Sequence, residues 1–122
     1  TILNNGVMVC YAPCRHSDGV GMGRWIRVAK AYDIPAGEQA TVDAEGTPIA
    51  IFNIDGVYHA ISDICIHLGA SLGEGWLDDH LIICPWHGWR FDVRTGASDF
   101  SDQVCIKRYE VTVKETELYV HL

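Results

Sequence analysis

Long apolar runs are missing from this sequence, and none approaches the roughly eighteen residues of a membrane-spanning helix. Residues 1–14 also lack the basic-then-apolar layout of a signal peptide. Cysteine is scarce: the 122 residues contain five, which is few, and an odd number, for a disulfide-stapled secreted domain. We therefore expect a soluble protein with no membrane segment, in the reducing cytoplasm.

Lysine and arginine are absent from residues 31–89, which carry nine carboxylates. This stretch has a formal charge of −9, and the remainder of the chain is +2. Nucleic-acid binding is disfavoured, because basic patches supply most of the affinity in such complexes. The acidic stretch could be steered toward a basic partner surface. For any single carboxylate, plain solubility is an equally good explanation.

Helical periodicity is also scarce, and only residues 70–75 could contain a helical turn. Short strand-like segments dominate instead, at residues 25–28, 39–43, 47–54, 57–61, 80–83, 89–93, 108–113 and 118–122. Turn signals separate them, of which Asp55-Gly56 is the strongest hairpin signal. The pattern predicts an all-β fold, an antiparallel barrel or sandwich.

Residues 1–23 look like an N-terminal extension, with turn and linker signals but no strand pattern. They contain Cys10, Cys14 and His16, a spacing that could bind a metal but has no matching second pair nearby. A structural or disordered segment is the simpler explanation. We expect the folded domain to span residues 24–122.

Two short stretches have the spacing of metal ligands, Cys65-Ile66-His67 and Cys84-Pro85-Trp86-His87. Sixteen residues separate His67 from Cys84. Each stretch offers one thiolate and one imidazole, follows a predicted strand and is followed by a glycine. Two loops of this kind can hold a metal centre between their tips.

Structural zinc is the first candidate, because two cysteines and two histidines are one of its common ligand sets. Zinc ligands usually come as paired cysteine knuckles or as two histidines on a helix, whereas both pairs here are mixed. A Cys and a His in each loop suit a two-metal cluster better, since one metal can take both sulfurs and the other both nitrogens.

These residues resemble the Rieske family, whose pattern is C-x-H, about sixteen residues, then C-x2-H. Leu68-Gly69 after the first histidine, and Pro85 and Gly88 around the second, also match. The resemblance implies one [2Fe-2S] cluster per chain, with Cys65 and Cys84 on one iron and His67 and His87 on the other. It also implies a small cluster-binding subdomain, about residues 62–99, that projects the two loops from a Rieske-type barrel.

The ligand set predicts the redox chemistry. Two ferric ions, two sulfides and two thiolates have no net formal charge, so the potential should lie within about −150 to +300 mV, above that of all-cysteine ferredoxins. High-potential Rieske proteins have two further cysteines, where this chain has Ala70 and Trp86, and a Ser and a Tyr where it has Trp89 and Phe91. Without those hydroxyl donors to the sulfurs, we expect a potential near the bottom of the range.

No other part of the chain looks catalytic: after residue 99 only one histidine remains, so the mononuclear iron site of a Rieske oxygenase has no ligands here. The resemblance is to the ferredoxin component of aromatic-ring dioxygenase systems, a non-enzymatic carrier of single electrons. It implies transient docking to a flavin reductase and a terminal oxygenase. Alternatives are the Rieske-like small subunit of an NAD(P)H-dependent nitrite reductase and, in a different class, a zinc-stabilised interaction module.

Other polar residues near the loops have simpler explanations. His59, His80 and His121 lie in or beside predicted strands and are interpreted as ordinary surface or core residues. Asp63, Asp78 and Asp79 could form an acidic docking rim, although a solvated face is the default interpretation.

Overall fold

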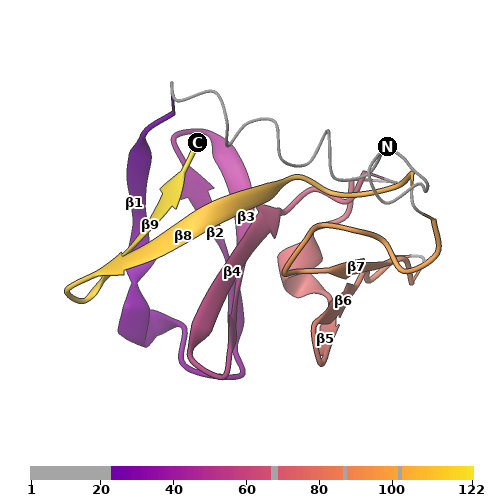
Figure 1. Cartoon of the computed structure of the whole chain (residues 1–122), viewed down its shortest axis with the longest axis horizontal. Coiled ribbons are helices and arrows are strands. Elements are labelled where there is room, and N and C mark those ends of the chain that lie inside the picture. The colour runs from indigo at the N-terminus through magenta and orange to yellow at the C-terminus, as the bar shows by residue number, and fades with distance from the viewer. Residues whose placement is uncertain (1–22, 67–68, 87, 102) are drawn as a thin grey trace.

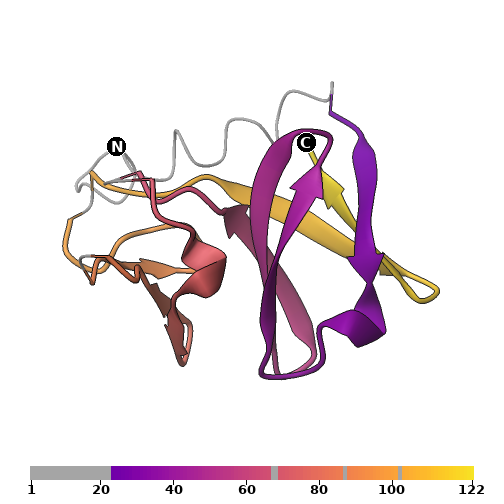
Figure 2. The same cartoon turned by 180° about the vertical axis from the view of Figure 1, so that it is seen from behind.

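The computed structural model describes residues 23–66, 69–86, 88–101 and 103–122. The strands of these residues form two antiparallel sheets that stand side by side (Figures 1 and 2). Of the predicted N-terminal extension, only Gly23 is among the described residues. The predicted all-β fold is confirmed.

The larger sheet is a barrel that is nearly closed. Its strand order is β1-β9-β8-β4-β3-β2, and the edge strands β1 and β2 contact each other. The strands are β1 (Trp25–Lys30), β2 (Gln39–Ala44), β3 (Thr47–Ile54), β4 (Val57–Ser62), β8 (Arg108–Lys114) and β9 (Glu117–His121), with a short 3-10 helix, η2 (Ala31–Asp33), after β1.

Two tight turns connect β2, β3 and β4. Glu45 and Gly46 have φ values of 53° and 94°, and Asp55 and Gly56 have 54° and 89°. Two consecutive residues at positive φ are typical of the two-residue hairpin turn whose twist matches that of the strands it joins. The predicted turn at Asp55-Gly56 is confirmed.

The smaller sheet has the order β5-β6-β7 and comprises β5 (Trp76–Asp78), β6 (Leu81–Ile83) and β7 (Arg90–Asp92). The helical turn expected within residues 70–75 is the 3-10 helix η3 (Leu72–Glu74). β5 was not predicted, because three residues beside glycines are too short to show an alternating pattern. The strands lie within residues 62–99, and the division into a barrel and a cluster-binding subdomain stays a prediction.

β3 is buried on both faces, which explains its near-continuous apolar sequence. Ile49 and Ile51 lie in the barrel interior, whereas Ala50 and Phe52 point the other way. This outer face packs against the small sheet in a second core, here called the seam core. Its members are Ala50, Phe52, Ile61, Cys65, Ala70, Leu72, Ile82, Cys84, Phe91, Val93 and Ile106.

Candidate metal centre

Two loops of matching backbone geometry present the predicted cysteines, residues 65–70 (the first loop) and 84–89 (the second loop). In the first loop the Cys65 amide donates to the Ala70 carbonyl at 2.8 Å, and the Gly69 amide donates to the Cys65 carbonyl at 2.8 Å. In the second loop Cys84 donates to Trp89 at 2.7 Å and Gly88 to Cys84 at 3.1 Å. Each cysteine is therefore held by the same pair of backbone hydrogen bonds.

Glycine is required by conformation at the fifth position of each loop. Gly69 and Gly88 have φ values of 79° and 76°, in the left-handed region where other residues are strained. Space is not the reason, because an added Cβ would meet nothing within 4 Å at either position. The glycines that follow the two histidines in sequence thus shape both loops.

Cys65 and Cys84 are buried to the same degree, each 1% exposed, and both belong to the seam core. Neither forms a disulfide, whereas Cys105 does. A buried free cysteine can be merely a small apolar residue. Two of them at the same position of matching loops supply two sulfur donors, which fits the sulfur side of an iron–sulfur centre.

The two predicted histidine ligands, His67 and His87, lie outside the described residues. Among the residues that are described, no group of three or more His, Cys, Asp or Glu side chains could hold a metal ion. The structure therefore brings Cys65 and Cys84 into one core, and the four-residue ligand set remains a prediction.

Trp89 and Phe91 occupy the two positions at which high-potential Rieske proteins have a Ser and a Tyr hydroxyl. Trp89 lies against Phe91, with ring centroids 6.4 Å apart, and edge-to-face against Phe100 at 4.8 Å. Phe91 is fully buried. Neither Trp89 nor Phe91 has a hydroxyl to donate to a sulfur, and the low potential stays a prediction.

Asp63 braces the first loop against the barrel. Its side chain accepts hydrogen bonds from Thr41 Oγ1 of β2 (2.9 Å), from Ser71 Oγ (3.0 Å) and from the Gly73 amide (2.8 Å). Asp63 is only 4% exposed, so its predicted place in an acidic docking rim is wrong. Asp78 and Asp79 are exposed, as a rim requires.

Gln39 makes a second connection between β2 and the same segment. Its Nε2 donates to the carbonyls of Gly73 and Gly75 at 2.8 and 2.9 Å. A Cβ at Gly73 would lie 2.1 Å from Thr41 Oγ1, so the two segments approach as closely as glycine permits. Sequence analysis missed both braces, since Gln39 and Thr41 lie more than twenty residues from the first loop and only the fold brings them there.

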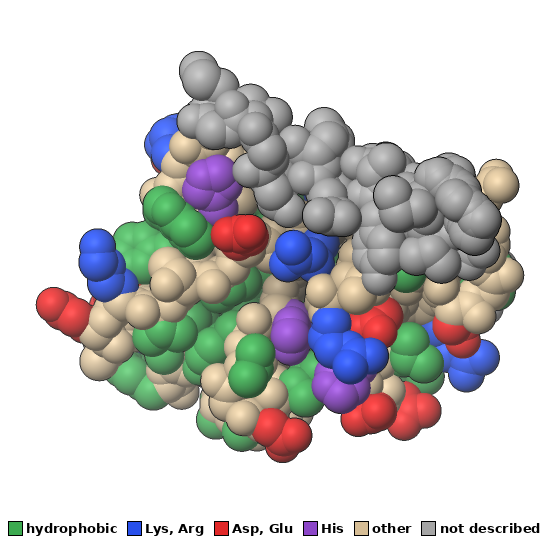
Figure 3. Space-filling view, viewed as in Figure 1, with side chains coloured by type: hydrophobic (Ala, Val, Ile, Leu, Met, Phe, Trp, Pro, Cys, Tyr) green, Lys and Arg blue, Asp and Glu red, His purple; other side chains and the backbone are tan. Residues whose placement is uncertain are grey.

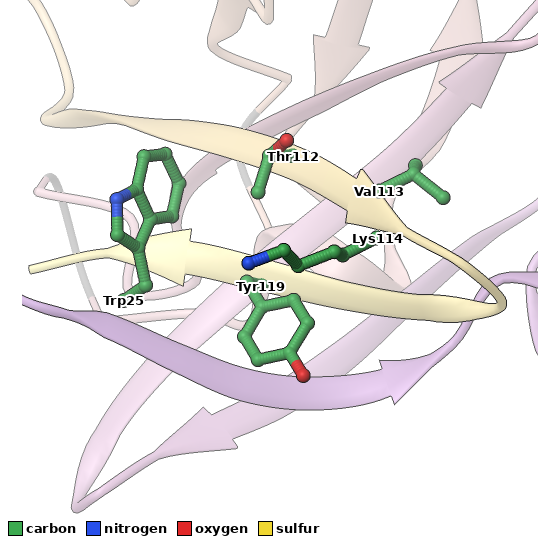
Figure 4. Close-up of a pocket in the computed structure, with 5 residues that line it drawn as sticks. All are labelled: Trp25, Thr112, Val113, Lys114 and Tyr119. Carbon is green, nitrogen blue, oxygen red and sulfur yellow. The ribbon is translucent and has the colours of Figure 1, made fainter.

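A groove of about 440 Å³ lies elsewhere, on the barrel. Figure 4 shows its lining residues on β1, β8 and β9: Trp25, Thr112, Val113, Lys114 and Tyr119. None of these comes from the small sheet or from either cysteine loop, so the groove is not part of the candidate metal centre.

Histidine and charged side chains meet where the barrel joins the small sheet, on the face shown in Figure 3. Burial lowers the pKa of His59 on β4, with His80, Arg94 and Arg108 lowering it further and Asp92 opposing them. Burial tends to raise the pKa of Asp92, but hydrogen bonds from Arg94, at 2.8 to 3.0 Å, and its charge lower that pKa overall. The two pKa shifts therefore share charged neighbours.

The sequence profile of the Rieske [2Fe-2S] domain matches residues 24–110. The chain is 40% identical to ferredoxin CarAc of Metapseudomonas resinovorans over 98 aligned residues. The alignment covers 79% of this chain and 92% of that protein. It is 32% identical to the ferredoxin component of the naphthalene 1,2-dioxygenase system of Pseudomonas aeruginosa, over 81% of this chain and 96% of the relative. The chain belongs to the Rieske [2Fe-2S] family, so its cofactor is a single [2Fe-2S] cluster.

Solved structures agree with this assignment. The ferredoxin of carbazole 1,9a-dioxygenase from Nocardioides aromaticivorans IC177 superposes with a TM-score of 0.73 at 32% identity, over 79% of this chain and 95% of that one. A chain of the complex of reduced oxygenase and oxidised ferredoxin in carbazole 1,9a-dioxygenase has a TM-score of 0.72 at 39% identity, covering 79% of this chain and 91% of its own. A nitrite reductase small subunit from Mycobacterium tuberculosis has a TM-score of 0.76 over 83% of this chain and 96% of its own. Its sequence identity is only 20%, so it shows the shared fold alone.

Within the described part of the chain, no helix has the length and apolar character needed to cross a bilayer.

The lowered pKa of His59 predicts a pH dependence of stability. The folded protein takes up a proton at His59 less readily than the unfolded chain, in which the pKa is near 6.5. Protonation below about pH 6.5 therefore favours unfolding, so the free energy of unfolding is highest above this pH and falls as the pH drops through it. Urea unfolding between pH 7.5 and 5 measures this slope, which His59→Gln should flatten and the control His121→Gln should leave unchanged. An unaltered slope in His59→Gln would contradict the assignment.

Proposed function

We propose that this chain is the ferredoxin component of an aromatic-ring dioxygenase system, a cytoplasmic one-electron carrier between a flavin reductase and a terminal oxygenase. The observation that carries the proposal is the pair of matching loops that bury Cys65 and Cys84, neither of them in a disulfide, in one core. The names of the relatives, ferredoxin components of dioxygenase systems, supply the partners. The chain itself contributes electron transfer and no substrate chemistry.

The ligand set completes the proposal. Cys65 and Cys84 hold one iron, and His67 and His87 the other. When bound, the cluster supplies uptake and release of one electron at a time. The protein holds the two cysteine loops in fixed geometry and excludes water from the sulfur side through the seam core, since both thiols are 1% exposed.

Exposed apolar side chains in and beside the two loops offer a place for partners to dock. Ile64 is 43% exposed, Ile66 54% and Trp86 61%. Large apolar residues at such exposure beside a redox centre favour a small, transient interface, and a tryptophan is a common source of its binding energy. The acidic rim residues Asp78 and Asp79 can help to steer a basic partner surface.

Replacing the proposed ligands tests the site. Cys65→Ser, Cys84→Ser and the double change His67→Ala with His87→Ala should each abolish the visible absorbance and the bound iron and sulfide, because an iron loses its protein donors. Cys105→Ser is the matched control and should keep the cluster, since Cys105 is already oxidised in a disulfide. A red-brown colour and an EPR signal that survive the double histidine change would rule out the ligand set. A colourless, EPR-silent protein that contains zinc would instead support an interaction module.

Docking is tested with a flavin reductase and a terminal oxygenase from the organism that encodes this chain. Oxygenase turnover with NADH should depend on adding the chain. Trp86→Ala should raise the concentration of chain needed for half-maximal turnover about tenfold, the effect of removing a moderate hot-spot residue. Tyr32→Ala removes an aromatic residue of similar exposure on η2; it is the control and should have no effect. Full turnover without the chain would refute its role as the carrier.

A further inference from the structure

Asp63 is a buried carboxylate beside the first loop. It lies two residues before Cys65 and is 4% exposed. Two residues of chain span at most about 7 Å, so its charge lies close to the proposed cysteine ligand. The environment of Asp63 can therefore affect how readily the cluster accepts an electron.

Three hydrogen-bond donors converge on one side-chain oxygen of Asp63. Oδ1 accepts from Thr41 Oγ1, Ser71 Oγ and the Gly73 amide, at 2.8 to 3.0 Å. Three donors that converge on one oxygen suit a carboxylate, which accepts hydrogen bonds and donates none. The donors hold the group in place, but all are neutral and none cancels its charge.

The ion pairs seen in the described part of the chain do not offset this charge. Among the described residues, none of the ion pairs involves Asp63. The sequence from residue 31 to residue 89 contains no Lys or Arg at all. A neutral amide or hydroxyl could accept similar hydrogen bonds without the cost of burying a charge, so the bracing role alone does not account for a carboxylate here.

We propose that the buried carboxylate of Asp63 lowers the reduction potential of the cluster. A negative charge close by disfavours the addition of an electron, and a buried charge is screened much less than one in solvent. The exposed carboxylates of Glu74 and Asp78 are in the same segment of chain but are screened by water. The inference rests on the ligand set proposed above and adds a second cause of low potential to the missing hydroxyl donors.

Asp63→Asn is the direct test, because asparagine keeps the shape and one acceptor oxygen but removes the charge. The midpoint potential of the intact cluster, measured by a redox titration followed by EPR, should become more positive. A tenfold change in the equilibrium constant for reduction is expected, which corresponds to about 59 mV for one electron. Asp78→Asn changes the net charge equally at an exposed position and should leave the potential unchanged.

Two further variants separate charge from bracing. Thr41→Val removes one hydrogen bond to Asp63 and keeps the charge, so it should lower the melting temperature without raising the potential. Thr41→Lys places an ammonium beside the carboxylate and should raise the potential even if Asp63→Asn fails to hold its cluster. The inference is overturned if neither Asp63→Asn nor Thr41→Lys raises the potential, or if Asp78→Asn raises it as much.

The iron–sulfur signal of the wild-type protein distinguishes a failure of this inference from a failure of the proposed function. A wild-type chain without the iron–sulfur signal would refute the proposed function itself. A wild-type chain that has the signal, together with Asp63→Asn and Thr41→Lys variants of unchanged potential, would refute only the role of Asp63.

Discussion

The packing of the small sheet against the outer face of β3 and β4 is the contact on which the rest of the structure depends. Phe52 and Ile61 of the barrel and Ile82 and Phe91 of the small sheet meet in the seam core. Cys65 and Cys84 lie in that same core, so the residues that join the two sheets also hold the cysteine loops. Close-packed cores resist displacement. We therefore expect the geometry of the centre to change little when the carrier gains or loses its electron.

The two sides of the cysteine loops differ in solvent exposure, and the function depends on both sides. The thiols lie on the buried side, where Asp63 and Gln39 tie the chain to β2. The other side carries exposed Ile66 and Trp86, which suit a partner that binds briefly and leaves. Electron transfer requires both features, a rigid protected centre and an accessible edge.

The features that could be predicted from the sequence are the local ones. Asp55-Gly56 predicts its turn because few other dipeptides accept two positive φ values, and residues 47–54 form one strand as expected because they are apolar on both faces. The cysteine stretches were recognised because their spacing is itself the signal. β5 and the Asp63 brace could not be predicted, because β5 is stabilised by pairing with β6, and the donors to Asp63 come from distant parts of the chain. Asp63 was therefore expected at the surface, where a lone carboxylate usually lies.

The central claim is that two histidines and two cysteines share one cluster. Electron–nuclear double resonance of the reduced protein, with all histidines labelled with nitrogen-15, tests it most directly. Strong coupling to two histidine nitrogens per cluster is predicted. A cluster that couples to no histidine nitrogen, or to only one, would contradict the account.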